Sequence, residues 1–160
     1  MNVTESSFSR VVTFCRLLDS KICKSLLGST VDITIIVKGM LQKDGSVVSS
    51  KVIDSVFKSF MNLCLVNQKY IKRDGAVSAV CIPIGDKGNR LYSFPTKEVR
   101  GLPFEATFEN IAFLLGKDVF SSGVNEGRQL VSVSVRLEDV SGRKIYQIID
   151  SIKASTQEPT

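Results

Sequence analysis

The residue types that most often carry enzyme chemistry are unevenly represented in this sequence. It contains four cysteines and 16 Asp and Glu residues, and histidine is absent. Without imidazole, Ser-His-Asp and Cys-His triads and the usual zinc ligand sets are excluded. A cysteine nucleophile would then need a lysine or a carboxylate as its base. The sequence accordingly predicts no catalytic residues, no metal site, no cofactor and no enzyme.

The spacing of the cysteines and carboxylates favours structural roles. No Cys-x-x-Cys pair occurs, so a metal knuckle or a redox motif of that kind is not indicated. The thiols are predicted to be buried small hydrophobes in a reducing compartment. Several carboxylates fall at predicted turns, which gives no pair facing each other for acid–base work. The cysteines are Cys15, Cys23, Cys64 and Cys81, and the turn carboxylates are Asp44, Asp74, Asp86 and Asp139.

Positive charge is the feature that indicates a binding function. Lys and Arg exceed Asp and Glu by 21 − 16 = 5, which favours anionic partners such as RNA or a lipid surface. Tyrosines beside the cations could stack on single-stranded bases. The candidate anion-binding residues are Arg10, Arg16, Lys21, Lys24, Lys69, Lys72, Arg73, Lys97 and Arg100, and the stacking candidates are Tyr70 and Tyr92.

The four cations nearest the N-terminus, Arg10, Arg16, Lys21 and Lys24, can form one binding surface only if the segment that carries them places them on one side. At 100° per residue, the apolar residues of 6–27 fall on one face and the cations on the other. Ser6 or Ser7 could cap the start, and Gly28 could end the segment. The pattern predicts an amphipathic helix with a basic polar face over residues 6–27.

The remaining segments alternate between strand and helix patterns. Strands are predicted at 31–41, 70–73, 76–84, 91–94, 129–138 and 144–150, with a hairpin turn at Asp74-Gly75 and a strand that ends at Pro83 or lies at an edge. A second helix is predicted over 50–65. Residues 104–115 fit both a helix ending at Gly116 and a strand, and Pro103 favours a strand at the start. Residues 121–127 are predicted to be a loop.

Together these elements predict an α+β fold: a single domain of residues 1–154, with a mainly antiparallel sheet packed with two or three helices, and a flexible tail at 155–160. No signal peptide and no apolar run of membrane-spanning length is visible. The sequence therefore predicts a cytosolic protein that is not secreted and has no transmembrane segment.

The order of elements resembles a known viral family. The strand Val31-Asp32-Ile33-Thr34-Ile35-Ile36-Val37, the helix 50–65, the segment Gly101-Leu102-Pro103-Phe104 and the strand 130–137 are similar in layout to the small matrix proteins of rhabdoviruses. The resemblance implies a self-associating structural protein that bridges nucleocapsid and membrane. It also implies a location in the host cytoplasm, peripheral at a membrane, and in the virion. The animal-virus members carry a disordered, lysine-rich N-terminal tail with a Pro-Pro-x-Tyr motif, whereas this chain enters the predicted helix almost at once and has no such motif. The basic face of 6–27 would therefore have to replace that tail in membrane attachment.

Three function classes follow from these observations. The first is a non-enzymatic, matrix-like protein whose partners are a second copy of itself, the viral nucleocapsid and an anionic membrane. The second is a movement-type protein that binds single-stranded RNA non-specifically, since Leu63-Cys64-Leu65-Val66-Asn67-Gln68-Lys69 resembles a strand region of the thirty-kilodalton movement proteins. The third is a small intracellular enzyme without histidine chemistry, which would need a cleft holding charged residues.

Overall fold

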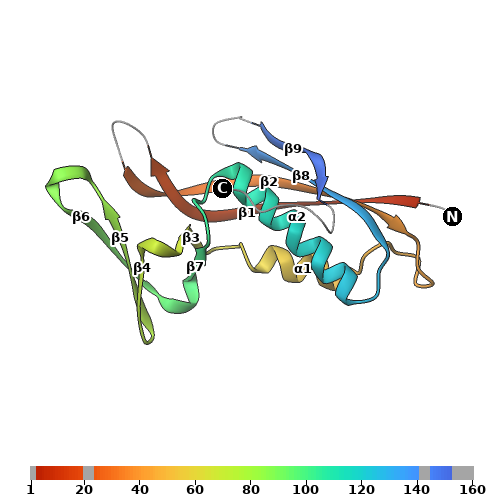
Figure 1. The fold of residues 1–160 in the computed structure, drawn as a ribbon, viewed down its shortest axis with the longest axis horizontal. Helices are drawn as coiled ribbons and strands as arrows, with labels where there is room; N and C mark the ends of the chain where they lie inside the picture. Colours follow the sequence, from red (N-terminus) through yellow and green to blue (C-terminus); the bar gives the residue numbers. More distant parts are fainter. Residues whose placement is uncertain (1–2, 20–23, 141–144, 153–160) are drawn as a thin grey trace. The chain divides into compact units, whose positions relative to one another are not determined.

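A computed structural model describes residues 3–19, 24–140 and 145–152, and in these ranges the chain forms two α-helices, nine strands and three short 3-10 helices. The predicted α+β class is confirmed (Figure 1). The elements are β1 (Val3–Asp19), β2 (Lys24–Met40), α1 (Ser50–Lys58), β3 (Cys64–Asn67), η1 (Gln68–Tyr70), β4 (Ile71–Asp74), β5 (Val77–Pro83), η2 (Gly85–Lys87), β6 (Asn89–Pro95), η3 (Thr96–Glu98), β7 (Val99–Leu102), α2 (Phe108–Asn125), β8 (Leu130–Asp139) and β9 (Ile145–Ile152).

The chain divides into two compact units. Unit 1 comprises Met1–Val12, Thr30–Ser59 and Thr107–Thr160, and unit 2 comprises Thr13–Ser29 and Phe60–Ala106. The domain bounds of 1–154 stay a prediction. The tail expected at 155–160 and the residue Lys21 lie outside the described residues.

The predicted basic helix over 6–27 is wrong, because β1 and the start of β2 occupy this segment. Phe8 and Val12 are four residues apart, a separation that fits one face of a helix and equally one face of a strand. Burial alternates from one residue to the next, as it does in a strand: Val12 and Phe14 are buried, whereas Val11 is 66% exposed. The segment is also rich in Ser, Thr and Val, which favour extended backbone over helix. The described cations of this segment, Arg10, Arg16 and Lys24, therefore lie on strands.

In unit 1, the sheet is built around the antiparallel pair of β2 and β8, and β9 pairs with β8 in turn. The predicted alternation of residues 31–37 is confirmed, because Val31, Ile33, Ile35 and Val37 are all fully buried. The register shifts between Lys38 and Gly39. This shift explains why Val131 is 47% exposed, whereas Val133 and Val135 of the same predicted strand are buried.

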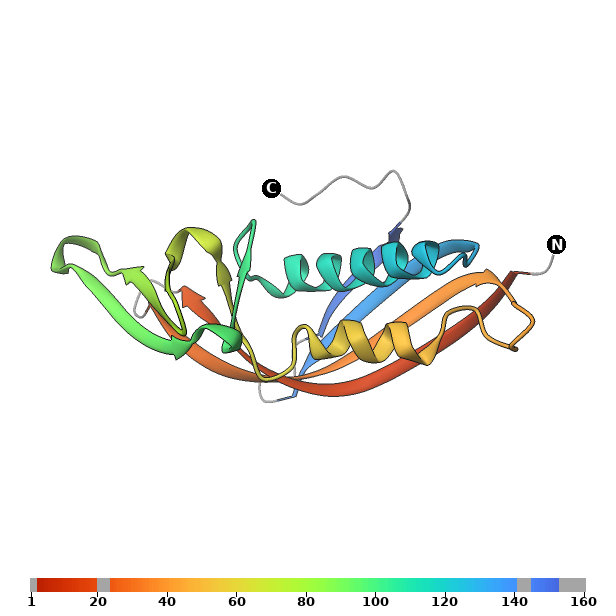
Figure 2. The same cartoon turned by 90° about the horizontal axis from the view of Figure 1, so that it is seen from below.

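Both helices cover one face of this sheet (Figure 2), and α2 contacts α1, β8 and β9. Helix α1 begins at Ser50 as predicted, and the hydroxyl of the N-cap Ser49 accepts from the Val52 amide at 3.3 Å. It ends at Lys58 rather than at residue 65, because Cys64, Leu65 and Val66 form a buried strand.

Helix α2 resolves the ambiguity of residues 104–115 and corrects two expectations. It starts at Phe108 behind the N-cap Thr107, so no strand forms at residue 104. It continues through Gly116 and the expected loop at 121–123. Both glycines are buried in the helix, and an added Cβ on Gly123 would lie 2.6 Å from Leu130 Cδ1. Gly123 therefore permits close packing rather than marking a helix end.

Unit 2 contains two groups of paired strands. The second part of β1 pairs in parallel with β3, and β3 pairs in parallel with β7. The strands β4, β5 and β6 form an antiparallel sheet of their own, and β5 ends at Pro83 as predicted. The hairpin turn between β4 and β5 is formed by Gly75 and Ala76, because Asp74 pairs with Val77, so it lies one residue beyond the predicted Asp74-Gly75. Gly75 has φ 65°, the left-handed conformation that glycine adopts without strain.

The buried apolar residues of unit 2 form a cluster between these strands, made of Cys64, Val66, Val80, Ile82 and Val99. In the described residues, no helix has the length and apolar character needed to cross a membrane.

Candidate functional site

The described anion-binding candidates belong to both units, Arg10 to unit 1 and the others to unit 2. In unit 1, the Arg10 guanidinium lies 3.4 Å from Asp54 and 5.7 Å from the centroid of the Phe57 ring. The side chains of Arg10 and Asp54 are both about half exposed. An exposed ion pair of this kind contributes little to stability, and it places a carboxylate beside the cation.

In unit 2, Lys69 and Tyr70 are brought together by a carboxylate. Glu105 accepts from Lys69 Nζ at 2.9 Å, from Asn67 Nδ2 at 3.1 Å and from the Tyr70 hydroxyl at 3.3 Å. The neighbouring carboxylate raises the pKa of Lys69. Burial, followed by the charge of Glu105, raises the pKa of Tyr70. The stacking candidate Tyr70 is thus engaged by an intramolecular partner.

The other candidates of unit 2 lie on several elements. Tyr92 packs against the apolar cluster, and its hydroxyl accepts from the Leu26 amide at 3.3 Å. The Arg100 guanidinium lies 4.5 Å from the Phe60 ring centroid. The remaining described candidates are Arg16 on β1, Lys24 on β2, Lys72 and Arg73 on β4, and Lys97 on η3. Anion binding by these residues stays a prediction.

The feature best suited to bind and act on a small molecule is a cavity of about 340 Å³ in unit 2, called here the thiol pocket. This volume lies within the usual range for small-molecule sites. Its walls come from β1, β2, β3, β6 and the connections around them, and they combine two thiols, a carboxylate, a carboxamide and aromatic rings. The lining residues are Thr13, Phe14, Cys15, Gly28, Asn62, Leu63, Cys64, Phe94 and Glu98.

Two thiols lie side by side in this pocket because β1 and β3 run parallel with Cys15 directly paired to Cys64. The Cys15 amide also donates to the Leu63 carbonyl at 2.9 Å. A hydrogen bond from the Cys64 thiol lowers the pKa of Cys15, although burial opposes this shift. The same hydrogen bond and burial raise the pKa of Cys64. Cys15 is therefore the thiol that ionises first.

Other residues that line the thiol pocket could recognise a polar, planar ligand. Asn62 has φ 58°, and it is the single non-glycine residue with positive φ in the described ranges. The backbone N–H of Asn62 donates to the Thr13 carbonyl at 2.7 Å, and this hydrogen bond holds the left-handed residue in place at the pocket. The Glu98 carboxylate can accept from N–H groups, and the half-buried Phe94 can contact a planar ring.

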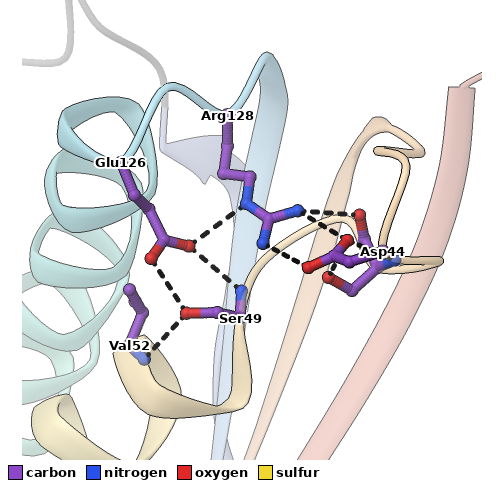
Figure 3. Close-up of polar contacts among 6 residues, drawn as sticks. Asp44, Ser49, Val52, Glu126 and Arg128 are labelled. Atoms are coloured by element: carbon purple, nitrogen blue, oxygen red, sulfur yellow. Dashed lines mark hydrogen bonds and ion pairs between the residues drawn. The ribbon is translucent and has the colours of Figure 1, made fainter.

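A second polar cluster lies in unit 1 (Figure 3), called here the Arg128 clamp and formed by Asp44, Ser46, Ser49, Glu126 and Arg128. Arg128 donates to Asp44 Oδ2 at 2.8 Å, to Asp44 Oδ1 and the Ser46 carbonyl at 3.1 Å each, and to Glu126 Oε1 at 3.2 Å. The Ser49 hydroxyl donates to Glu126 Oε2 at 2.9 Å. The clamp joins the turn after β2, the start of α1 and the connection from α2 to β8.

The electrostatics of the clamp indicate a structural role. The hydrogen bond from Arg128, aided by Ser46, holds the pKa of Asp44 well below its usual range. Burial raises the pKa of Glu126, but hydrogen bonds from Ser49 and Arg128 outweigh burial and lower it overall. The Arg128 side chain is only 10% exposed, and its N–H groups are directed at protein acceptors. Cavities of about 470 and 320 Å³ border this cluster.

Within the described part of the chain, no three His, Cys, Asp or Glu side chains lie close enough together to hold a metal ion. The side chains that line the thiol pocket offer thiol, carboxylate and carboxamide groups. A thiolate can remove a proton or attack an electrophilic carbon, while Glu98 and Asn62 orient the bound molecule.

Sequence reasoning missed the thiol pocket because it treated each cysteine alone. Burial was expected of all four, and it is confirmed for Cys64, whereas Cys15 and Cys81 are half-buried and Cys23 lies outside the described residues. The pairing of Cys15 with Cys64 depends on a parallel register across 49 positions (64 − 15). The predicted helix over 6–27 placed Cys15 on a different element and so concealed the pair.

No protein-family model and no curated protein sequence matches the chain. Solved structures do match. The 6-pyruvoyl tetrahydropterin synthase of Plasmodium vivax aligns over 92% of this chain and 98% of its own, with a TM-score of 0.66 and 14% identity. The Plasmodium falciparum enzyme aligns over 91% and 98%, with a TM-score of 0.62 and 13% identity. The Caenorhabditis elegans enzyme aligns over 92% and 96%, with a TM-score of 0.52 and 12% identity.

These similarities show a shared fold and correct three expectations. The expected resemblance to rhabdovirus matrix proteins is wrong, because the matching chains are 6-pyruvoyl tetrahydropterin synthases. The expected non-enzymatic structural function, with its bridging of virion and membrane, is also wrong, because the named structures that share the fold are synthases and not viral structural proteins. Of the three function classes, the small enzyme without histidine chemistry agrees best with the comparisons. Nucleocapsid, RNA and membrane partners gain no support from them.

Proposed function

We propose that this chain is a small enzyme that binds a planar nitrogen heterocycle of the pterin class in the thiol pocket and acts on it through Cys15. The observation that carries the proposal is the combination, in one cavity, of an acidified thiol, a carboxylate and an aromatic ring. The fold shared with tetrahydropterin synthases supports the choice of ligand class. Self-association is compatible with this fold and is part of the proposal.

The pocket suits a fused two-ring ligand in size and in chemistry. A cavity of about 340 Å³ holds a small heterocycle, and the open space around Gly28, where an added Cβ would meet nothing within 4 Å, leaves room for a substituent. Phe94 supplies a ring face, and Glu98 accepts hydrogen bonds from amino and ring N–H groups. Such groups lie along one edge of a pterin ring.

Cys15 is the reactive group of the proposed site. As a thiolate it can take a proton from a carbon of the ligand and return it as the thiol, which requires no imidazole. Cys64 acts as a positioning residue because its hydrogen bond favours the thiolate form of Cys15. The absence of histidine from the sequence is thus compatible with proton transfer at this site.

The binding step is tested by titrating pterin into the reduced, full-length protein and following pterin fluorescence. Phe94→Ala and Glu98→Gln should each weaken binding by about tenfold, which corresponds to about 1.4 kcal/mol. Leu91→Ala is the matched control on β6, because Leu91 is 68% exposed and belongs to no wall of the pocket. Glu109→Gln, in the first turn of α2, is the control for Glu98.

Cys15→Ser should retain pterin binding within about threefold, since a hydroxyl keeps the size of the side chain but not its acidity. Absence of saturable binding to the wild-type protein would overturn the proposal. Equal loss in the Leu91→Ala and Phe94→Ala variants would place the ligand outside the thiol pocket and would also overturn it.

A further inference from the structure

The two thiols of unit 2 are placed as a pair that could form a bond. Cys15 and Cys64 are direct partners across adjacent parallel strands. Neighbouring strands lie about 4.7–4.9 Å apart, within the 4.4–6.8 Å range of Cα separations that disulfides tolerate. Paired residues of adjacent strands direct their side chains to the same face of the sheet, and both cysteines line the same cavity. Both sulfurs are in the reduced, free form.

The two thiols differ in access from the pocket. Both line the cavity, but Cys15 is half-buried, whereas Cys64 is 2% exposed. Cys64 belongs to the apolar cluster with Val66 and Val80, and Cys15 packs against that cluster from its edge. A small reagent that enters the pocket therefore reaches Cys15 more easily than Cys64.

The two thiols also differ in reactivity. The hydrogen bond from Cys64 lowers the pKa of Cys15 and so increases the fraction of thiolate, which is the nucleophilic form. Burial and the same hydrogen bond keep Cys64 protonated until its partner has reacted. One thiol is thus suited to attack and the other to resolve the product.

We propose that Cys15 and Cys64 form a redox-active dithiol, in which Cys15 reduces a hydroperoxide and Cys64 converts the product into an intramolecular disulfide. This activity does not depend on the proposed pterin substrate. Its substrate class is hydrogen peroxide or a small alkyl hydroperoxide that fits the cavity of about 340 Å³.

The chemistry proceeds in two balanced steps. In the first, the Cys15 sulfur attacks the terminal peroxide oxygen, the O–O bond breaks and the alcohol or water leaves with a proton. Cys15 becomes a sulfenic acid, oxidised by two electrons, and the peroxide is reduced by two. In the second, the Cys64 sulfur attacks the Cys15 sulfur, the S–O bond breaks, the hydroxyl leaves as water with the Cys64 proton, and the S–S bond forms.

The experiment treats the reduced, full-length protein with hydrogen peroxide, blocks the remaining thiols with N-ethylmaleimide and maps the digested peptides by mass spectrometry. The main product should be a single disulfide joining the peptides that contain Cys15 and Cys64, with a mass lower by two hydrogen atoms. This part of the test requires no variant, so it does not depend on the folding of a mutant.

Variants separate the two steps. Cys64→Ser should stop the reaction at the sulfenic acid, which dimedone traps on Cys15, and Cys64→Ala repeats this test with an apolar side chain suited to a buried site. Cys15→Ser should give neither product. Cys81→Ser is the matched control and should behave as wild type, because Cys81 lies on β5 and does not line the thiol pocket.

The proposal is overturned if peroxide modifies Cys81 or Cys23 before Cys15, or if the disulfide joins Cys15 to Cys23. It is also overturned if Cys15 proceeds to the sulfinic acid in the wild-type protein while Cys64 stays reduced. Because no pterin is present in this experiment, its failure would leave the proposed function untouched, and the failure of pterin binding would leave the dithiol proposal untouched.

Discussion

Substitution of Gly39 by alanine tests the register of the sheet in unit 1. Gly39 lies on β2 where the pairing with β8 shifts by one residue. A Cβ added there would lie 2.6 Å from the Gln129 carbonyl oxygen, 3.0 Å from Val47 Cγ1 and 3.1 Å from Leu130 Cα. Two of these three atoms belong to the backbone of the opposite segment. A methyl group therefore cannot be accommodated by a side-chain rotation.

The expected effect is the difference between two opposing terms. Overpacking that forces the backbone to move costs about 1–3 kcal/mol. Replacing glycine by alanine restricts the unfolded chain and returns about 0.4–1 kcal/mol where the backbone is compatible. Gly39→Ala should thus lower the free energy of unfolding by about 1–2 kcal/mol. In a chain of this length each kcal/mol corresponds to roughly 2–4 °C in Tm.

The assay is urea denaturation followed by circular dichroism, with thermal unfolding as a second measurement. Gly28→Ala is the matched control on the same strand, because an added Cβ there meets nothing within 4 Å. This control should leave stability unchanged or raise it by about 0.4–1 kcal/mol. If Gly39→Ala were as stable as Gly28→Ala, the close approach of β2 to the segment before β8 would be wrong.

Three further predictions concern single interactions. Thr107→Ala removes the hydroxyl that accepts from the Asn110 amide at 3.2 Å and should lower the unfolding free energy by about 1 kcal/mol in urea denaturation. The pKa of Asp44 is lower in the folded state than in the unfolded state, so its contribution is fully present above about pH 4 and is lost as the pH falls below that value. Arg128→Met should therefore reduce stability at neutral pH and flatten its acid dependence. Cys64→Ala should shift the pH midpoint of Cys15 alkylation by iodoacetamide upward, because the hydrogen bond that favours the thiolate is lost.

Local sequence patterns predicted the elements in which a single requirement, such as burial of one strand face or a left-handed turn residue, decides the residue types. The alternation of 31–37 is unambiguous because one face of β2 is buried completely. Asp74-Gly75 marks a hairpin because a left-handed backbone is needed in so tight a turn. The segment 6–19 was misassigned because Phe8 and Val12 satisfy two periodicities, and only the neighbouring strands decide between them.

The candidate site was less predictable than the fold. The thiol pair arises from a parallel register between β1 and β3, which no local pattern encodes. Glu98 likewise lines the thiol pocket only because the chain folds so that β6 and η3 lie at the same cavity as the two cysteines. Positive charge was visible in the composition, but its arrangement on separate elements was not. The absence of histidine excludes an imidazole from this chain's own side chains, but it does not exclude thiol chemistry.

The most direct test of the proposed site is a crystal structure of the reduced protein with bound pterin. The proposal predicts that the ring lies in the thiol pocket, in contact with Phe94, with its amino edge directed at Glu98 and a carbon of the ligand within reach of the Cys15 sulfur. A pterin bound beside the Arg128 clamp, or at any surface away from the thiol pocket, would contradict it.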